Sequence, residues 1–130
     1  MQYALLIYTP EPTGDVPEDV MAAELDGYAA FTKHLVDRGV MKGGEALEPT
    51  ATATTVRVQN GRTITTDGPF AETKETLGGF YLIEAADLDE AISFAAMIPG
   101  ARRGCIEVRP VWDYGAATGA EEPATATAGN

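Results

Sequence analysis

The sequence predicts an α+β domain in which one antiparallel sheet carries two helices on a single face and an inserted β-hairpin. Three observations lead to this prediction. Short runs of strand length, apolar or β-branched, recur along the chain, and two segments between them place apolar residues at spacings of three and four. An Asn-Gly pair joins two β-branched runs. Because 130 residues with 45% hydrophobic content suffice for one core, we expect a single domain over residues 1–114.

The first third of the chain is expected to form a strand, a helix and a second strand. Residues 2–8 are a short apolar run followed by two prolines, which indicates a buried strand. Asp15 and Glu18 have the spacing of a capping box, and apolar residues after them predict a helix to about Arg38 that Gly39 ends. Those apolar residues are Met21, Leu25, Tyr28, Phe31 and Leu35. Residues 40–47, interrupted by Gly43-Gly44, predict the second strand.

The remaining elements follow from equally local signals. Residues 54–58 and 62–66 flank Asn60-Gly61, which favours a type I′ hairpin turn. A charged connection (67–77) leads to a strand at 80–83, and Asp87 with Glu90 repeats the capping-box spacing before a second helix. Its expected apolar face is Leu88, Ala91, Ile92, Ala95 and Ile98. Residues 106–112 alternate as a last strand, and residues 115–130 have the composition of a disordered tail.

The element order is therefore β-α-β, a hairpin, and β-α-β again. Two such units that share one antiparallel sheet give a ferredoxin-like domain with both helices on one face. The other face of the sheet needs a cover, and a second copy of the same sheet is the most economical one. The sequence thus predicts a homodimer.

The composition excludes several classes of function. A net charge of −11 repels phosphate backbones, so we expect no nucleic-acid partner. No apolar run approaches a membrane span of about 20 residues, and the single cysteine allows no intramolecular disulfide. These features predict a cytoplasmic protein. The ligand spacings of a metal site and a phosphate-binding glycine loop are missing, so we expect neither metal nor cofactor.

The stretch from Asp67 to Glu75, Asp-Gly-Pro-Phe-Ala-Glu-Thr-Lys-Glu, is the most distinctive of the chain. Asp-Gly-Pro predicts a turn, in which the Asp67 carboxylate can accept backbone N–H groups. Glu72 and Lys74 add charges of both signs on the same irregular segment. The segment either binds a polar ligand or moves a proton, or Asp67 only stabilises the turn while the other charges are solvated.

On these residues the chain resembles the DGPF type of the YCII-related proteins. Similar pieces are Gly43-Gly44-Glu45-Ala46-Leu47, Gly78-Gly79-Phe80-Tyr81 and Glu107-Val108-Arg109-Pro110-Val111-Trp112, and the resemblance runs from about residue 2 to about 113. It implies a dimeric α+β barrel and an association with extracytoplasmic-function sigma factors, without a settled activity. The wider group is proposed to use a His-Asp pair in a cleft between the sheet and the first helix, and the family's helix histidine aligns with Tyr28.

Tyr28 and Asp67 are accordingly the candidate catalytic residues. Tyr28 lies on the apolar helix face, where its phenol either packs in the core or faces a pocket. Four further candidates are expected to bind a ligand: Tyr8, Glu45, Glu72 and Lys74. Arg109 either holds a ligand carboxylate or, as we favour, pairs with Glu107 or Glu84.

Two more side chains with reactive groups are expected to have no chemical role. His34 lies six residues after Tyr28, at the polar edge of the helix, and is predicted to be solvated. Cys105 precedes an apolar strand and is predicted to be an inert, buried thiol.

Three functions are compatible with the sequence. The first is a cofactor-free enzyme that binds a small polar organic molecule in a cleft and transfers a proton. The second is a sensor that binds such a molecule without turnover, and the third is an interaction partner in a sigma-factor regulatory system. A pocket is required by the first two, whereas an interaction partner requires an exposed apolar patch.

Overall fold

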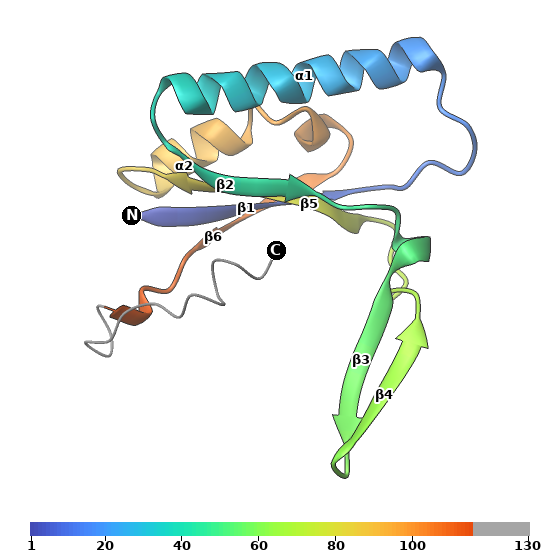
Figure 1. Cartoon of the computed structure of the whole chain (residues 1–130). Coiled ribbons are helices and arrows are strands. Elements are labelled where there is room, and N and C mark those ends of the chain that lie inside the picture. The colour runs from blue at the N-terminus through green and yellow to red at the C-terminus, as the bar shows by residue number, and fades with distance from the viewer. Residues whose placement is uncertain (116–130) are drawn as a thin grey trace.

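The computed structural model describes residues 1–115 and confirms the predicted α+β class (Figure 1). In chain order, the elements are β1 (Gln2–Thr9), α1 (Glu18–Asp37), β2 (Met41–Ala46), η1 (Thr50–Thr52), β3 (Thr54–Gln59), β4 (Arg62–Asp67), β5 (Thr76–Glu84), α2 (Leu88–Ala95), η2 (Pro99–Arg102) and β6 (Cys105–Pro110), where η marks a short 3₁₀ helix. Apart from Gly115, the predicted tail lies outside the described residues, so the domain boundary stays a prediction. No helix within residues 1–115 has the length and apolarity that a membrane crossing requires.

The main sheet has four strands in the order β2-β5-β1-β6, and every neighbouring pair is antiparallel. Each β-α-β unit contributes two strands, and the two units interleave, which is the ferredoxin-like topology that the element order predicts. Figure 1 shows α1 and α2 together on one face of this sheet. Strands β3 and β4 form a separate two-stranded sheet.

Side chains alternate between the two faces of the main sheet, as strand geometry requires. On the helix side, Tyr3, Leu5 and Ile7 of β1 and Tyr81 and Ile83 of β5 are buried. They form one core with Phe31 and Leu35 of α1, Ala91 and Phe94 of α2, and Ile98, which precedes η2. The other face, called the open face below, carries Ala4, Leu6, Phe80 and Leu82, which are only partly buried.

Helix α1 differs from its prediction at the N-terminal end. It begins at Glu18, and the N-cap position is held by Pro17 without a side-chain hydrogen bond, so Asp15 is not the cap. Pro17 has an extended ψ of 143° and lacks an N–H, so the chain turns into the helix only after it. At the other end, Gly39 has a φ of 71°, which confirms it as the stop.

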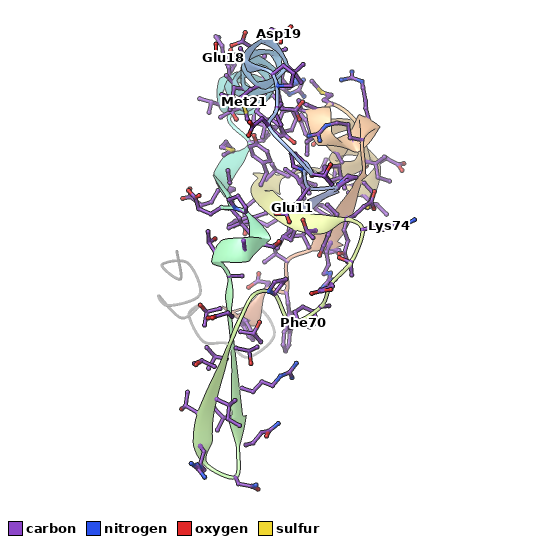
Figure 2. All side chains as sticks on the ribbon, turned by 90° about the vertical axis from the view of Figure 1, so that its right-hand side faces the viewer. Glu11, Glu18, Asp19, Met21, Phe70 and Lys74 are labelled. Atoms are coloured by element: carbon purple, nitrogen blue, oxygen red, sulfur yellow. The ribbon has the colours of Figure 1, made fainter. Side chains whose placement is uncertain are left out.

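Only part of the predicted apolar face of α1 is buried. Phe31 and Leu35 lie in the core, whereas Met21 is 47% and Leu25 is 61% exposed. The first half of the helix is therefore not covered by the described chain, and Figure 2 shows Met21 at this end.

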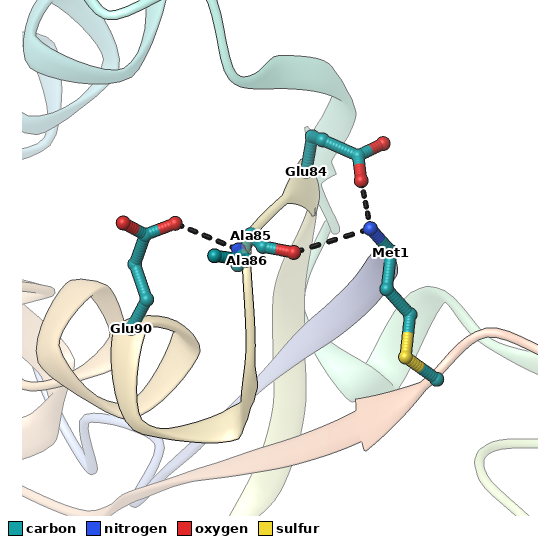
Figure 3. A network of polar contacts seen from close by, with 5 residues as sticks. All are labelled: Met1, Glu84, Ala85, Ala86 and Glu90. Carbon is teal, nitrogen blue, oxygen red and sulfur yellow. Dashed lines mark hydrogen bonds and ion pairs between the residues drawn. The ribbon is translucent and has the colours of Figure 1, made fainter.

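Helix α2 confirms its predicted capping box. The Glu90 backbone N–H donates to the Asp87 carboxylate at 2.9 Å, and the Glu90 carboxylate accepts from the Ala86 N–H at 2.9 Å. Figure 3 shows the contact between Glu90 and Ala86. Beside it, the amino group of Met1 donates to Ala85 O at 3.1 Å and pairs with Glu84. The predicted apolar face is partly wrong, because Leu88 and Ile92 are half exposed and Phe94 is buried instead.

The predicted hairpin is confirmed and extends away from the main sheet. Asn60 and Gly61 both have positive φ, 52° and 76°, as a type I′ turn requires. We call residues 54–67 the arm. In Figure 1 the arm projects on the side of the sheet opposite to the helices.

Candidate functional site

A cleft of about 490 Å³ lies between the first half of α1 and the strands β2 and β5. The helical repeat places three polar residues of α1 along this cleft: Glu24, Tyr28 and Thr32 are spaced four residues apart and so lie on one stripe of the helix. All three line the cleft, together with Tyr81 of β5 and Arg103 after η2. The cleft therefore combines hydroxyl groups, the Arg103 cation and the Glu24 carboxylate over a largely apolar base.

Tyr28 is the half-buried phenol at the centre of this stripe. Loss of water around the ring raises the pKa of Tyr28 above its usual value, and the nearby Glu24 carboxylate raises it further. A hydrogen bond from the backbone of Gly100 and the charge of Arg103 act in the opposite direction. The phenol consequently stays protonated at neutral pH and can donate a hydrogen bond to a ligand.

The Gly100 backbone comes close to Tyr28 because Gly100 has no side chain. A Cβ at this position would lie 2.8 Å from the Tyr28 hydroxyl and 3.1 Å from side-chain carbons of Ile7 and Thr9. A side chain here would therefore displace the phenol or the adjoining strand.

The inner wall of the cleft is rigid. Tyr81 shares a 3.0 Å hydrogen bond with the Thr32 hydroxyl, and its ring packs edge-on against Phe31 with centroids 5.0 Å apart. The Tyr81 hydroxyl is thus bonded to Thr32, whereas Tyr28, bonded only to the Gly100 backbone within residues 1–115, also lines the cavity.

Within residues 1–115 the guanidinium group of Arg103, the cation of the cleft, forms one ion pair. Arg103 pairs with Glu24, and the two side chains are 48% and 31% exposed. An exposed pair of this kind contributes little to stability. A ligand carboxylate can therefore compete with Glu24 for the guanidinium group at small cost.

Glycines form the base of the cleft next to β2 and β5. A Cβ at Gly44 would lie 2.7 Å from Phe80 O, and one at Gly79 would lie 2.9 Å from Glu45 O. Side chains at these positions would force the strands apart, and their absence leaves room above the backbone.

The expected convergence of Asp67 with Tyr28 is not found within one chain. Asp67 ends β4 at the base of the arm, is exposed, and does not line the cleft. Within residues 1–115 its carboxylate makes no hydrogen bond, so it does not stabilise the turn either. Two other hydrogen bonds hold the turn: the Gly68 N–H donates to Ala53 O at 2.7 Å, and the Thr55 side-chain hydroxyl donates to Gly68 O at 2.8 Å.

Several other predicted site residues lie on the side of the open face. Tyr8, Lys74 and Glu75 border a hollow next to Cys105, while Phe70 and Thr73 border a second hollow that also includes Tyr8. In Figure 2, Phe70 and Lys74 lie on the segment that follows the arm. Glu72 is exposed.

The side chains of Glu45 and Arg109 do not point into the cleft under α1. Glu45 borders the cleft, but it pairs in register with Phe80, so its side chain lies on the open face. Arg109 donates to Glu107 at 3.1 Å, which confirms the favoured pairing.

Cys105 and His34 have no position in the cleft. The prediction of a buried thiol is wrong, because Cys105 is exposed at the start of β6 and contacts Glu75 at 3.7 Å. Desolvation and the Glu75 charge raise the pKa of this thiol, which disfavours the reactive thiolate. His34 is partly buried, and its ring lies 6.0 Å from that of Phe94, on the side of α2.

No group of three or more potential metal ligands occurs within residues 1–115. A larger cavity, about 690 Å³, lies at the far end of the sheet between Met1, Glu84 and Trp112. The cleft below α1 remains the better candidate because it brings together phenol, hydroxyl and guanidinium groups.

Sequence reasoning named Tyr28 and Glu45 among the residues that line the cleft, but it missed four polar ones: Glu24, Thr32, Tyr81 and Arg103. Glu24 and Thr32 could have been predicted, because each lies four residues from Tyr28 on the same side of the helix. Arg103 and Tyr81 come from distant parts of the sequence, and only the sheet order brings them to α1.

The Asp67→Asn variant tests the remaining role of Asp67. Because the carboxylate is exposed and makes no hydrogen bond or ion pair within residues 1–115, we expect the free energy of unfolding to change by less than about 0.5 kcal/mol in urea titrations. We also expect ligand binding to be unchanged within twofold. A tenfold loss of affinity in a folded variant would instead place Asp67 in the site of an assembled protein.

The fold and the site together define a small ferredoxin-like protein with a polar cleft under its first helix. The family model of the YCII-related domain matches residues 1–115, and the chain belongs to the YCII-related family. An uncharacterised protein of Rhizobium meliloti (strain 1021) is 41% identical over 117 residues, which are 88% of this chain and 94% of that protein.

A solved structure with a similar arrangement is the 5-chloro-2-hydroxyhydroquinone dehydrochlorinase TftG from Burkholderia phenoliruptrix, in complex with 2,5-dihydroxybenzoquinone. It has 20% sequence identity to this chain and a TM-score of 0.45, and the match covers 90% of this chain and 98% of TftG.

Proposed function

We propose that the protein binds a small organic acid in the cleft under α1. The observation that supports this proposal is the joint presence of the protonated Tyr28 phenol and the weakly held Arg103 at one cavity of about 490 Å³. A guanidinium group binds carboxylates in a bidentate manner, and a phenol donates to a second oxygen of the ligand. The apolar part of the molecule would lie over the glycine backbone of β2 and β5.

Binding is better supported than proton transfer. A cofactor-free enzyme needs a base close to the reacting proton. Glu24 is the carboxylate whose side chain reaches the cleft from α1, and it is paired with Arg103. Tyr28, with its raised pKa, is a donor and a poor base. Catalysis would therefore require the ligand first to separate Glu24 from Arg103.

The Tyr28→Phe variant is the direct test. Ligands are first found by thermal-shift screening of aromatic and aliphatic carboxylic acids, and dissociation constants are then measured by calorimetry. Loss of one hydrogen bond worth about 0.5–1.5 kcal/mol should weaken binding roughly 3- to 10-fold. Arg103→Gln should weaken acids more than their neutral amides.

Tyr8→Phe is the matched control, because it removes the same hydroxyl from a strand residue outside the cleft. A ligand that responded to Tyr8→Phe but not to Tyr28→Phe would contradict the proposal and place the site on the open face.

We further propose that the protein is a homodimer in which each copy covers the open face of the other. Both helices lie on the opposite side, so the described chain leaves Ala4, Leu6, Phe80 and Leu82 without a second layer. Sheets that are apolar on both faces are normally covered on both. The predicted interaction with a sigma-factor system and the cytoplasmic location stay predictions.

A further inference from the structure

We propose that the arm (residues 54–67) is a clasp that lies against the open sheet face of a second copy of this chain. The proposal rests on the homodimer proposed above and adds to it a defined contact. It is independent of what the cleft under α1 binds.

The arm has no core of its own. Every residue of β4 is exposed, as are all residues of β3 except Thr55, and the two strands make their main contacts with each other. Val56 is 60% and Val58 is 69% exposed. A two-stranded hairpin in water is marginally stable at best, so an ordered arm of this kind requires a surface to pack on.

The two faces of the arm differ in character. In register, Thr54 pairs with Asp67, Val56 with Thr65 and Val58 with Thr63, so one face is β-branched except for Asp67 at its base. The other face pairs Arg57 with Ile64 and ends in Gln59 and Arg62. The first face is suited to pack on apolar side chains. The arginines lie on the second face, which points away from that contact, so they can reach carboxylates only at its edge.

Charge points to a second copy as the occupant. The arm contains two arginines and one acidic residue, Asp67 at its base, whereas the whole chain has 9 basic and 20 acidic residues. Within residues 1–115 neither Arg57 nor Arg62 forms an ion pair. The apolar centre of the open face is bordered by the carboxylates of Glu45 on β2 and Glu107 on β6, of which Glu107 pairs with Arg109 of its own chain. Glu45 forms no ion pair within residues 1–115, so it is the carboxylate open to an arginine of the arm.

The base of the arm is fixed in a direction that allows this contact. The Glu11 carboxylate accepts hydrogen bonds from the backbone N–H and the hydroxyl of Thr50, just before β3, which also lowers the pKa of Glu11. Gly68, just after β4, is bonded to Ala53. The arm thus leaves the domain on the side of the open face, as Figure 1 shows.

In a two-fold symmetric dimer each copy offers the same surface to the other, so the arm contact forms twice. Two arms and two sheet faces can supply the area of about 1,200–2,000 Å² that stable interfaces bury. A nucleic acid is a poorer occupant for the arginines, because the net charge of −11 repels it.

Sedimentation equilibrium of the full chain and of two double variants tests the clasp. The test variant is Arg57→Glu/Arg62→Glu. The matched control, Lys33→Glu/Arg102→Glu, changes the net charge equally on exposed residues outside the arm. We expect the full chain to have twice its 13.7 kDa mass and to dissociate more readily as salt is raised. The arm variant should raise the dimer dissociation constant at least about tenfold at low salt, and the control less than threefold.

Circular dichroism and cleft-ligand affinity, measured on the same samples, show that each variant is folded. A full chain that is monomeric at about 100 μM, far above the concentrations at which specific dimers form, would overturn both the dimer and the clasp. A dimer whose dissociation constant changes equally in the arm variant and in the control would overturn the clasp alone. Loss of cleft binding with an intact, arm-dependent dimer would count against the proposed ligand and leave the clasp supported.

Discussion

Replacing Gly104 by alanine is expected to lower the free energy of unfolding by at least about 3 kcal/mol, because the new methyl group has no space. A Cβ at Gly104 would lie 2.0 Å from the Tyr8 carbonyl oxygen and 2.9 Å from the Thr9 Cα. Both obstacles belong to the main chain of β1, so no side-chain rotation can relieve the clash. Either β6 or the end of β1 has to move.

Urea titration and thermal melting measure this effect directly. In a domain of this size, 3 kcal/mol corresponds to a fall in Tm of about 10 °C. Gly14→Ala is the matched control, since a Cβ there meets nothing within 4 Å, and we expect its Tm to stay within about 2 °C of the original. Equal effects of the two substitutions would show that the β1–β6 approach is looser than described.

The same substitution has a consequence for the cleft. Gly104 directly follows Arg103, the cation that pairs with Glu24. A shift of the chain at this point should therefore weaken binding of a carboxylate ligand even under conditions where the variant is folded.

Local signals in the sequence predicted most of the fold. The Asp87–Glu90 capping box and the Asn60-Gly61 turn are each complete within a few residues, so no distant contact was needed to recognise them. The ferredoxin-like order followed from the succession of strands and helices. Asp15 failed as a cap because Pro17 keeps the backbone extended for two more residues.

The candidate site was harder to predict from the sequence, because strand order and loop geometry bring its residues together from distant parts of the chain. Tyr28 was placed correctly on the inner side of α1. Its neighbours Tyr81 and Arg103 reach it through the strand order and through the η2 turn, which no local pattern reveals. Asp67 was placed wrongly relative to Tyr28, because the direction in which the arm leaves the domain depends on contacts such as Glu11 with Thr50.

Helix α1 contains two leucines that looked equivalent in the sequence and should respond differently to substitution. Leu35→Ala removes a side chain with no exposed surface and leaves a cavity in the core, which costs about 2–5 kcal/mol in the free energy of unfolding. Leu25→Ala shortens a side chain that is 61% exposed and lines the cleft, so its cost should be below about 1 kcal/mol.

Ligand binding should show the opposite order. Leu25→Ala removes apolar contact area from the cleft and should weaken binding several-fold, whereas Leu35→Ala, studied at a temperature where it is folded, should bind nearly as the original. Urea titration and calorimetry on both variants give the two comparisons. If Leu25→Ala costs as much stability as Leu35→Ala, the first half of α1 must be covered in solution by another surface. In that case the cleft under α1 is not open to a ligand in the free protein.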